Sequence, residues 1–533
     1  MIWARRLQWT VASAIFSAGV WTAFVRDLLA GCSAGRLNRF DGALFSLQAL
    51  YTSRGLTPYR DFGFVYPPGN AWLFGSLLGL DSLASLNAAV AVVVGIAILA
   101  NVALLWIFVG RSPGLLAASG LLLLISGLAI SLWATMTATS LPSQLSITIV
   151  LLLALSVRAG PFDRVAVRLS AAVAFFLALC RWDTMAAFLL VELALLAGGA
   201  VLALLAPEAR SAVMEMVRRI GRAAIAHASG LGLAMLAVLM SGLWAGALDN
   251  VIDFMFRVPF TIRPYRDLPL PSFTSLTDRN AWWLLCTGAI VAILVTMIAD
   301  LFTKTRNGRN VDPALLRAIL LASLPLSAEP YALGRSDGVH FIPLVVLTLA
   351  ALLLIAFDSG LKDGLARYRL VAAVFLLLPA LPAGTELFAL GLHLEACGHT
   401  ERELTRSLAD CRALVPDDVA SIFVGRTQYD RFLLNRVALY HVRLDVKPAT
   451  AFISDEPGIQ NDCLFGERIA SNLANAPRPM LTFLDTRPGS TEPNLTRNMK
   501  SCGKIEDFLE MAPHRVLGSC AIDRRPIEVR LYE

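Results

Sequence analysis

Residues 84–109 read ASLNAAVAVVVGIAILANVALLWIFV, a stretch without a charged side chain. An α-helix rises 1.5 Å per residue, so roughly 20 apolar residues cross the hydrocarbon core of a bilayer, which is about 30 Å thick. Helices of soluble domains are usually shorter and apolar on one face only. The stretch therefore predicts a helix that spans a membrane.

The composition extends this prediction to most of the chain. Of the 533 residues, 56% are hydrophobic and 16% are charged, and the mean hydropathy is +0.63. A soluble globular chain carries about 25% charged residues. These values exclude a disordered chain, a collagen-like repeat and a cytosolic enzyme. The net charge of +6 comes without a basic stripe or recognition motif, so we expect no nucleic-acid partner.

Further apolar runs predict a mainly α-helical, polytopic bundle of about eleven spans, with membrane lipid as the surrounding solvent. The predicted spans are 8–25, 84–109, 113–133, 144–158, 169–181, 184–206, 223–246, 281–302, 313–329, 339–357 and 370–391. After them, no run is long enough to cross a bilayer. We therefore expect a transmembrane domain over residues 1–391 and a second domain over residues 392–533.

The second domain is predicted to be α/β. Strand-like runs at 420–424, 480–483 and 527–531 alternate with helical stretches such as 401–413 and 464–474. The sequence leaves open whether this domain binds an acceptor, covers a site or only stabilises the protein.

Lys and Arg collect in alternate loops between the predicted spans, the last of which holds Lys362, Arg367 and Arg369. Cytoplasmic loops of membrane proteins carry this excess of basic residues. The pattern predicts a multi-pass protein of the plasma (inner) membrane with a cytoplasmic N-terminus. An odd number of spans then makes the C-terminal domain extracytoplasmic.

The cysteines agree with this orientation. Cys180 and Cys286 fall in predicted spans, whereas the other six fall on the predicted external side: Cys32, Cys397, Cys411, Cys463, Cys502 and Cys520. An oxidising compartment permits disulfides there. We expect the local pairings Cys397–Cys411 and Cys502–Cys520, and free thiols throughout are the alternative.

The first external loop, residues 26–70, is too polar to be only a connector. Residues 43–54, ALFSLQALYTSR, have helical spacing and predict an amphipathic helix on the membrane surface that ends at Gly55. Asp41 stands at the start of this helix. It can be an N-cap, or it can be an unpaired carboxylate that acts as a general base towards a hydroxyl.

Other polar clusters interrupt the apolar runs. Arg181-Trp182-Asp183 separates two predicted spans, the loop 247–280 carries several arginines, and a third cluster runs from Glu329-Pro330-Tyr331 to His340. Ionisable groups at membrane depth are costly and are usually paired or functional. Arg181 and Asp183 can neutralise each other as a structural pair. Arginines can instead bind and stabilise a departing phosphate.

The stretch Arg54-Gly55-Leu56-Thr57-Pro58-Tyr59-Arg60-Asp61-Phe62, with Asp41 before it and Pro67-Pro68 after it, resembles the first external loop of the GT-C superfamily. It is most similar to the branch of the protein mannosyltransferases and the lipid A aminoarabinose transferases. Members are multi-span glycosyltransferases that use polyprenyl-phosphate sugars. The resemblance implies a GT-C-like bundle with Asp41 as catalytic base, Asp61 as a second catalytic aspartate, Arg60 at the donor phosphate and Tyr59 in support.

The segment Gly334-Arg335-Ser336-Asp337 with His340 resembles a late external loop of uncharacterised bacterial members. The analogy implies that Arg335 and His340 bind the donor phosphate, supported by Asp337, Arg181 and Asp183. The chain departs from the family pattern in two places. Gly42 stands where a second acidic residue often follows the aspartate, and Val65-Tyr66 stands where a basic residue often precedes the two prolines.

We therefore expect a glycosyltransferase, for a hexose or a pentose, that moves a sugar from a polyprenyl-phosphate donor to a hydroxyl of a glycan, lipid or protein at the external membrane face. A transporter or flippase for a lipid-linked sugar and a non-catalytic membrane scaffold are the alternatives. No Walker loop or histidine metal motif is found. We expect no cofactor and no metal; a divalent cation held by Asp41 and Asp61 is the less favoured alternative.

Overall fold

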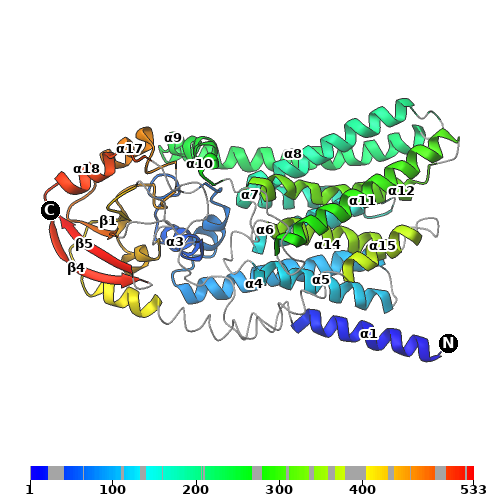
Figure 1. Ribbon diagram of the computed structural model, residues 1–533, viewed down its shortest axis with the longest axis horizontal. Helices are drawn as coiled ribbons and strands as arrows, with labels where there is room; N and C mark the ends of the chain where they lie inside the picture. Colours follow the sequence, from blue (N-terminus) through cyan, green and yellow to red (C-terminus); the bar gives the residue numbers. More distant parts are fainter. Residues whose placement is uncertain are drawn as a thin grey trace.

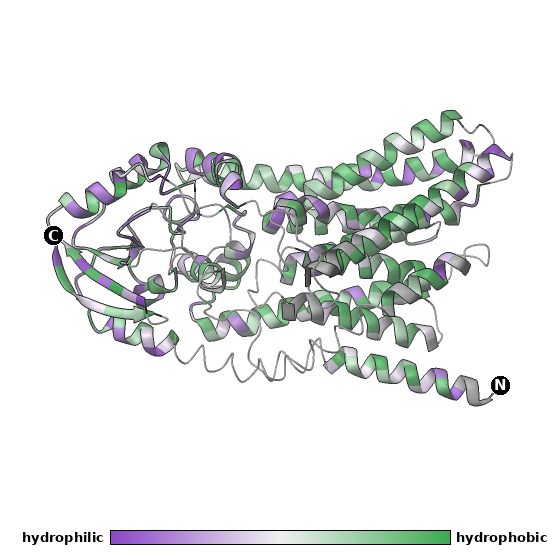
Figure 2. Cartoon of the chain, viewed as in Figure 1, coloured by the Kyte–Doolittle hydropathy of each residue, from purple (hydrophilic) through white to green (hydrophobic). Residues whose placement is uncertain are grey.

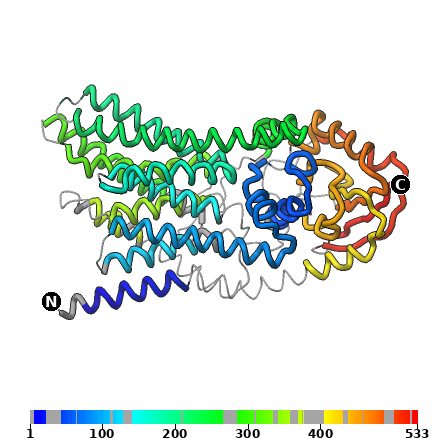
Figure 3. Tube along the Cα trace, turned by 180° about the vertical axis from the view of Figure 1, so that it is seen from behind, coloured from blue at the N-terminus to red at the C-terminus, as the bar shows by residue number. Residues whose placement is uncertain are grey.

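The computed structural model describes the chain except for residues 1, 22–40, 64, 110–112, 133–139, 159, 206, 208–209, 267–278, 308–310, 335–340, 358–365, 378–403, 430–436, 457, 487–499 and 523–524. The molecule is elongated, with long helices at one end and a small sheet domain at the other (Figure 1). The helix α3 (Asp41–Ser53) lies between them. The view from behind shows the same order (Figure 3).

Four helices of the described residues are long and apolar enough to cross a membrane: α4 (Leu83–Val109), α7 (Asp163–Leu205), α8 (Arg210–Trp244) and residues Leu285–Arg306 of α11 (Arg279–Arg306). Hydrophobic residues predominate along this end of the molecule (Figure 2). On α8, Leu233, Leu236, Met240 and Leu243 form an exposed apolar stripe. Such a stripe is unfavourable in water and suits contact with lipid.

Other helices fill the bundle around these four. They are α1 (Ile2–Val20), α5 (Pro113–Leu132), α6 (Ser140–Val157), α12 (Pro313–Ser323), the 3₁₀ segment η6 (Leu324–Ala328), α13 (Glu329–Gly334), α14 (Ile342–Phe357) and α15 (Ala366–Leu377). Each of the eleven predicted spans contains at least part of a helix, but several of these helices are too short to span a bilayer alone. The mainly helical membrane fold is thus supported, whereas the number of spans stays a prediction.

Helix α7 is broken at Arg181, whose backbone is non-helical with φ −152° and ψ 78°. On α8, His227 bonds to Glu192 in the second half of α7. One turn further along α8, a Cβ on Gly230 would lie 2.5 Å from the carbonyl oxygen of Ala171 in the first half. Residues 171 and 192 would be about 31 Å apart in a continuous helix. The chain therefore reverses at Arg181, where the sequence predicts a division into two spans.

Helix α3 forms where the sequence predicts a helix, but its predicted place on the membrane surface is wrong. Every residue from Ala43 to Tyr51 is buried, polar Ser46 and Gln48 included. A ring nitrogen of His441 in the C-terminal domain lies 3.0 Å from the Ala43 carbonyl oxygen, across a sequence separation of 398. Residues 71–77 and 437–443 pack against the helix, and its own spacing does not reveal this cover.

The chain between α3 and α4 contains the π-helix η2 (Ala71–Leu77). The connection after α8 consists of α9 (Leu248–Ile252), the π-helix η5 (Asp253–Arg257) and α10 (Val258–Arg266). These short elements lie where the long helices meet the C-terminal domain (Figure 1). Of these elements, α9 and η5 contact the C-terminal domain through Asn250 and Asp253, which both bind Arg468.

The C-terminal domain contains a five-stranded sheet in the order β2-β1-β3-β5-β4. Strand β1 (Ser421–Arg426) pairs in parallel with β2 (Lys447–Pro448) and β3 (Met480–Asp485). Strands β5 (Arg525–Tyr532) and β4 (Arg515–Ile522) continue the sheet in antiparallel fashion. All residues of β1 and β3 are buried, as in strands covered on both faces.

The covering helices are residues 404–412, η8 (Val437–Arg443), α17 (Cys463–Ala474) and α18 (Lys504–Met511). This arrangement confirms the α/β character and all three predicted strands. Strands β2 and β4 and helix α18 were not predicted.

The predicted disulfide pairing is wrong. Cys411 is bonded to Cys520, and Cys463 is bonded to Cys502. The sheet places β4 beside the helix that ends at residue 412, and the start of α17 beside the chain entering α18, so distant cysteines meet. Cys180 and Cys286 are free and buried, whereas Cys32 and Cys397 lie outside the described residues.

Candidate functional site

A cavity of about 720 Å³ lies where the bundle meets α10 and the first loop. Its walls come from the start of α6, the reversal of α7, α10, the segment η6–α13 and the start of α14, with Val65 and Tyr66 from the first loop. Most lining groups are apolar, including Leu326, Val346 and Leu347. Pockets for small ligands typically combine such walls with a few placed polar groups.

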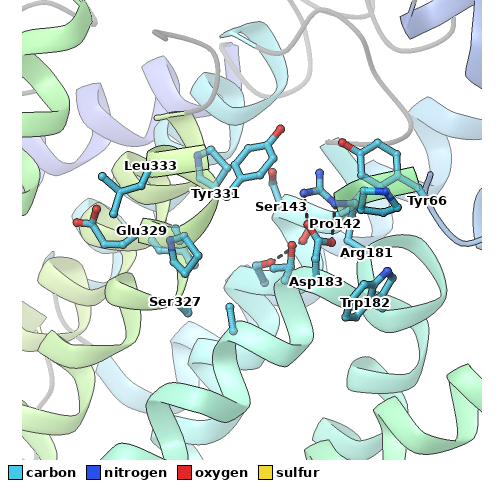
Figure 4. Close-up of a pocket in the computed structure, with 18 of the residues that line it drawn as sticks. Tyr66, Pro142, Ser143, Arg181, Trp182, Asp183, Ser327, Glu329, Tyr331 and Leu333 are labelled. Atoms are coloured by element: carbon cyan, nitrogen blue, oxygen red, sulfur yellow. Dashed lines mark hydrogen bonds and ion pairs between the residues drawn. The ribbon is translucent and has the colours of Figure 1, made fainter. Parts of the chain in front are cut away.

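Arg181 is the central polar group of the cavity. Its guanidinium carbon lies 4.5 Å from the ring centre of Tyr66 and 4.7 Å from that of Tyr331 (Figure 4). Aromatic faces attract cations at separations up to about 6 Å, and a planar guanidinium can stack on them. The two tyrosines thus hold Arg181 from both sides.

Asp183 completes the arrangement. It accepts hydrogen bonds from Nε of Arg181 at 2.9 Å and from Nη2 at 2.7 Å. Arg181 is 4% exposed, whereas Asp183 is 40% exposed. A bidentate Arg–carboxylate pair fixes both partners in one plane. The pairing confirms that these two residues interact, with the carboxylate being the more accessible partner.

Further charged groups line the same cavity. Arg263 on α10 is exposed, and Glu329 at the start of α13 accepts a hydrogen bond from Thr287 of α11 at 2.8 Å. In Figure 4 Glu329 lies on the opposite side of the view from Arg181 and Asp183. The cavity therefore offers cationic and anionic groups beside an apolar wall, a combination suited to an amphiphile with a charged head.

The first loop holds Tyr66 in place. Tyr59 has a φ of +65°, which non-glycine residues seldom adopt, and its hydroxyl donates to the Tyr66 carbonyl at 3.0 Å. Gly63 donates its backbone N–H to Ala451 of the C-terminal domain at 2.8 Å. A Cβ on Gly63 would lie 2.3 Å from the Phe254 ring, so this close contact requires glycine.

Asp61 is paired inside the first loop. Its carboxylate accepts hydrogen bonds from the Thr57 backbone and from Arg60, each at 2.8 Å, and Lys447 lies 3.7 Å away. Burial raises the pKa of Asp61, but these hydrogen bonds and positive charges outweigh it and lower the pKa below its ordinary value. Neither Asp61 nor Arg60 is among the residues that line the cavity.

The side chains of the remaining predicted site residues lie outside the described part of the chain. Asp41 is the first residue of α3, and Arg335, Asp337 and His340 belong to residues 335–340. Leu333 and Pro343, the described cavity residues nearest to that segment in sequence, stand on either side of it.

Sequence reasoning assigned no role to Tyr66 or Tyr331. In the sequence, both residues stand beside polar motifs. Their stacking on Arg181 could not be predicted, because the contact joins residues that no regular spacing relates. Among the described residues, no group of three or more His, Cys, Asp or Glu side chains is arranged to hold a metal ion.

No protein-family model matches the chain, and no curated protein is significantly similar to it.

Proposed function

We propose that the chain is a membrane glycosyltransferase of the GT-C type that uses a polyprenyl-phosphate sugar at the external membrane face. The observation that carries the proposal is the cavity around Arg181, which joins an apolar wall to charged groups next to the first loop. An isoprenoid chain would lie along Leu326, Val346 and Leu347. Its phosphate would face Arg181 and Arg263.

In the proposed reaction an acceptor hydroxyl attacks the anomeric carbon of the sugar. The new carbon–oxygen bond replaces the bond to the phosphate, the electron pair leaves with the polyprenyl phosphate, and the acceptor proton passes to a carboxylate. Asp41 is the proposed base, because the resemblance of the first loop to the first external loop of the GT-C superfamily implies that role. Positive charge stabilises the departing phosphate, and this kind of electrostatic stabilisation is often the largest single contribution to catalysis.

The two disulfides support an extracytoplasmic C-terminal domain, because such bonds persist in oxidising compartments. The proposed topology of eleven spans and a cytoplasmic N-terminus agrees with this placement. It would bring the first loop and the cavity to the side on which external acceptors are found.

The test is a transfer assay in membranes that contain the full chain. A polyprenyl-phosphate hexose or pentose, labelled in the sugar, should lose its label to a second molecule and release unlabelled polyprenyl phosphate. Asp41→Asn should slow this transfer about 10²–10⁴-fold, the usual effect of removing a general base. A donor that stays intact for both sugar classes would contradict the proposal, and an intact donor that crosses the bilayer would favour the flippase.

A further inference from the structure

Arg468 of α17 joins the C-terminal domain to the connection after α8. Its guanidinium donates to Asp253 and to Asn250, and it lies 5.8 Å from the centre of the Phe452 ring. Asp253 is 1% exposed, and its other oxygen accepts from Arg257 at 2.8 Å. Because a buried carboxylate needs its partners, this contact fixes how the domain sits on α9 and η5.

Asn250 in turn contacts the first loop. The Asn250 amide donates to the Tyr59 carbonyl oxygen at 2.6 Å. That carbonyl belongs to the residue with φ +65°, a conformation that persists only where the surroundings hold it. One amide thus binds both to Arg468, through its oxygen, and to Tyr59, through its nitrogen.

Tyr59 continues the series to the cavity. Its side chain is 2% exposed, and its hydroxyl donates to the Tyr66 carbonyl at 3.0 Å. The Tyr66 ring stacks on Arg181, which binds Asp183. Unbroken contacts therefore run from the C-terminal domain to the central pair of the cavity, through residues far apart in sequence.

We propose that the C-terminal domain sets the position of Tyr66 over Arg181, with Arg468 and Tyr59 as positioning residues. When Arg468 releases Asn250, the strained turn at Tyr59 relaxes and Tyr66 moves from Arg181, so the cavity opens. The domain thereby controls access to the cavity instead of serving as a passive cap. This inference does not depend on the reaction proposed for the cavity.

The test measures access to the cavity directly. Thr184, which lines the cavity, is replaced in the full chain by Thr184→Cys, and the purified protein in lipid nanodiscs is labelled with a water-soluble maleimide. Arg468→Gln and Tyr59→Phe should each raise the labelling rate about two- to tenfold. Each breaks one hydrogen bond in the series from Arg468 to Tyr66, and the loss of one hydrogen bond changes an equilibrium by about this factor. The double variant should gain little beyond the larger single effect, because both changes break one series of contacts.

Arg515→Gln is the matched control, because it removes an exposed ion pair with Glu533 in the same domain. Its labelling rate should equal that of the parent. The same variants without Thr184→Cys give the background from native thiols, which include the buried free cysteines Cys180 and Cys286. If Arg468→Gln raises this background labelling, the labelling rate of the milder variant Tyr59→Phe is used to test the proposal. Unchanged or slower labelling of that variant, or additive effects in the double variant, would overturn the proposal.

Discussion

Nδ1 of His227 lies 2.7 Å from Oε1 of Glu192, and both side chains are fully buried between α8 and the second half of α7. Nε2 of the histidine and Oε2 of the glutamate have no hydrogen-bond partner within the described part of the chain. Buried pairs of this kind give little net stability but fix which residues face each other. The pair therefore sets the register of α8 against the second half of α7, which follows the reversal at Arg181.

Removing one member of this pair should be much more harmful than removing both. We expect Glu192→Leu or His227→Leu to lower the free energy of unfolding by about 3–5 kcal/mol, because each leaves a polar group alone in an apolar interior. The double variant should recover most of this loss. Unfolding of detergent-solubilised protein by a denaturing detergent measures the effect. Additive losses in the double variant would show that the two residues do not interact.

A conservative change at Arg181 should be costly. Arg181→Lys keeps the positive charge but loses the planar fork that binds both Asp183 oxygens and stacks between the two tyrosines. We expect sugar transfer to fall about 10- to 100-fold, the loss of one to two charge-assisted hydrogen bonds.

Arg158→Lys provides the matched control for that change. Arg158 lies 5.8 Å from the single ring of Phe108, away from the cavity. The control should keep transfer within about twofold of the parent, as usual for surface substitutions. Equal activity of both variants would remove Arg181 from the mechanism.

The C-terminal domain should lose stability as the pH rises from about 4 to 7. The pKa of Asp455 is raised to about 7: burial is the main cause, the positive charge of Arg426 opposes it, and the nearby carboxylates of Glu456, Asp485 and Glu506 add to it. In this window the folded carboxyl holds a proton that the unfolded chain has lost, so stability falls with pH and levels off above about 7. The full difference corresponds to roughly 4 kcal/mol.

Asp455→Asn removes that proton equilibrium and tests the cause. The variant should unfold at a higher temperature than the parent at pH 8 and at a similar temperature at pH 4, measured by scanning fluorimetry of the whole protein in detergent. Asp418→Asn, at an exposed position of the same domain, should follow the parent at both pH values. A parent-like pH profile for Asp455→Asn would assign the dependence to other groups.

The disulfide connectivity can be read by mass spectrometry of a non-reduced digest. Linked peptides should join Cys411 to Cys520 and Cys463 to Cys502. Replacing either pair by serines should destabilise the domain by about 2–5 kcal/mol, as for native disulfides of other small domains. A peptide that links Cys502 to Cys520 would contradict the observed sheet arrangement.

The features that could be predicted are those that depend on a short, continuous stretch of sequence. Uninterrupted apolar runs such as 84–109 predict helices because length and hydropathy suffice. The charges of Arg181 and Asp183 marked the break in α7, because ionisable groups rarely continue an apolar span. Strands β1 and β3 were visible as short apolar runs.

Features that depend on distant segments were not predictable. The burial of α3 comes in part from η8 of the C-terminal domain, about 400 residues further along. Buried and exposed residues do not alternate regularly along β4, and this alternation is the pattern by which a half-buried strand is recognised. The contacts of Arg468 with Asn250 and of Tyr66 with Arg181 join residues that no local spacing relates. The predicted catalytic residue Asp61 shows the same limit, since its pairing with Lys447 arises only in the folded protein.

The most direct measurement of the central claim is photocrosslinking with a polyprenyl phosphate that carries a diazirine near the phosphate. The proposed function predicts that the label attaches to peptides from the reversal of α7 and from the segment η6–α13, both of which line the cavity. Excess unlabelled polyprenyl phosphate should abolish this labelling, and Arg181→Lys should weaken it. Labelling spread along the lipid-exposed surfaces of α4, α8 and α11, and undiminished by the competitor, would contradict the account.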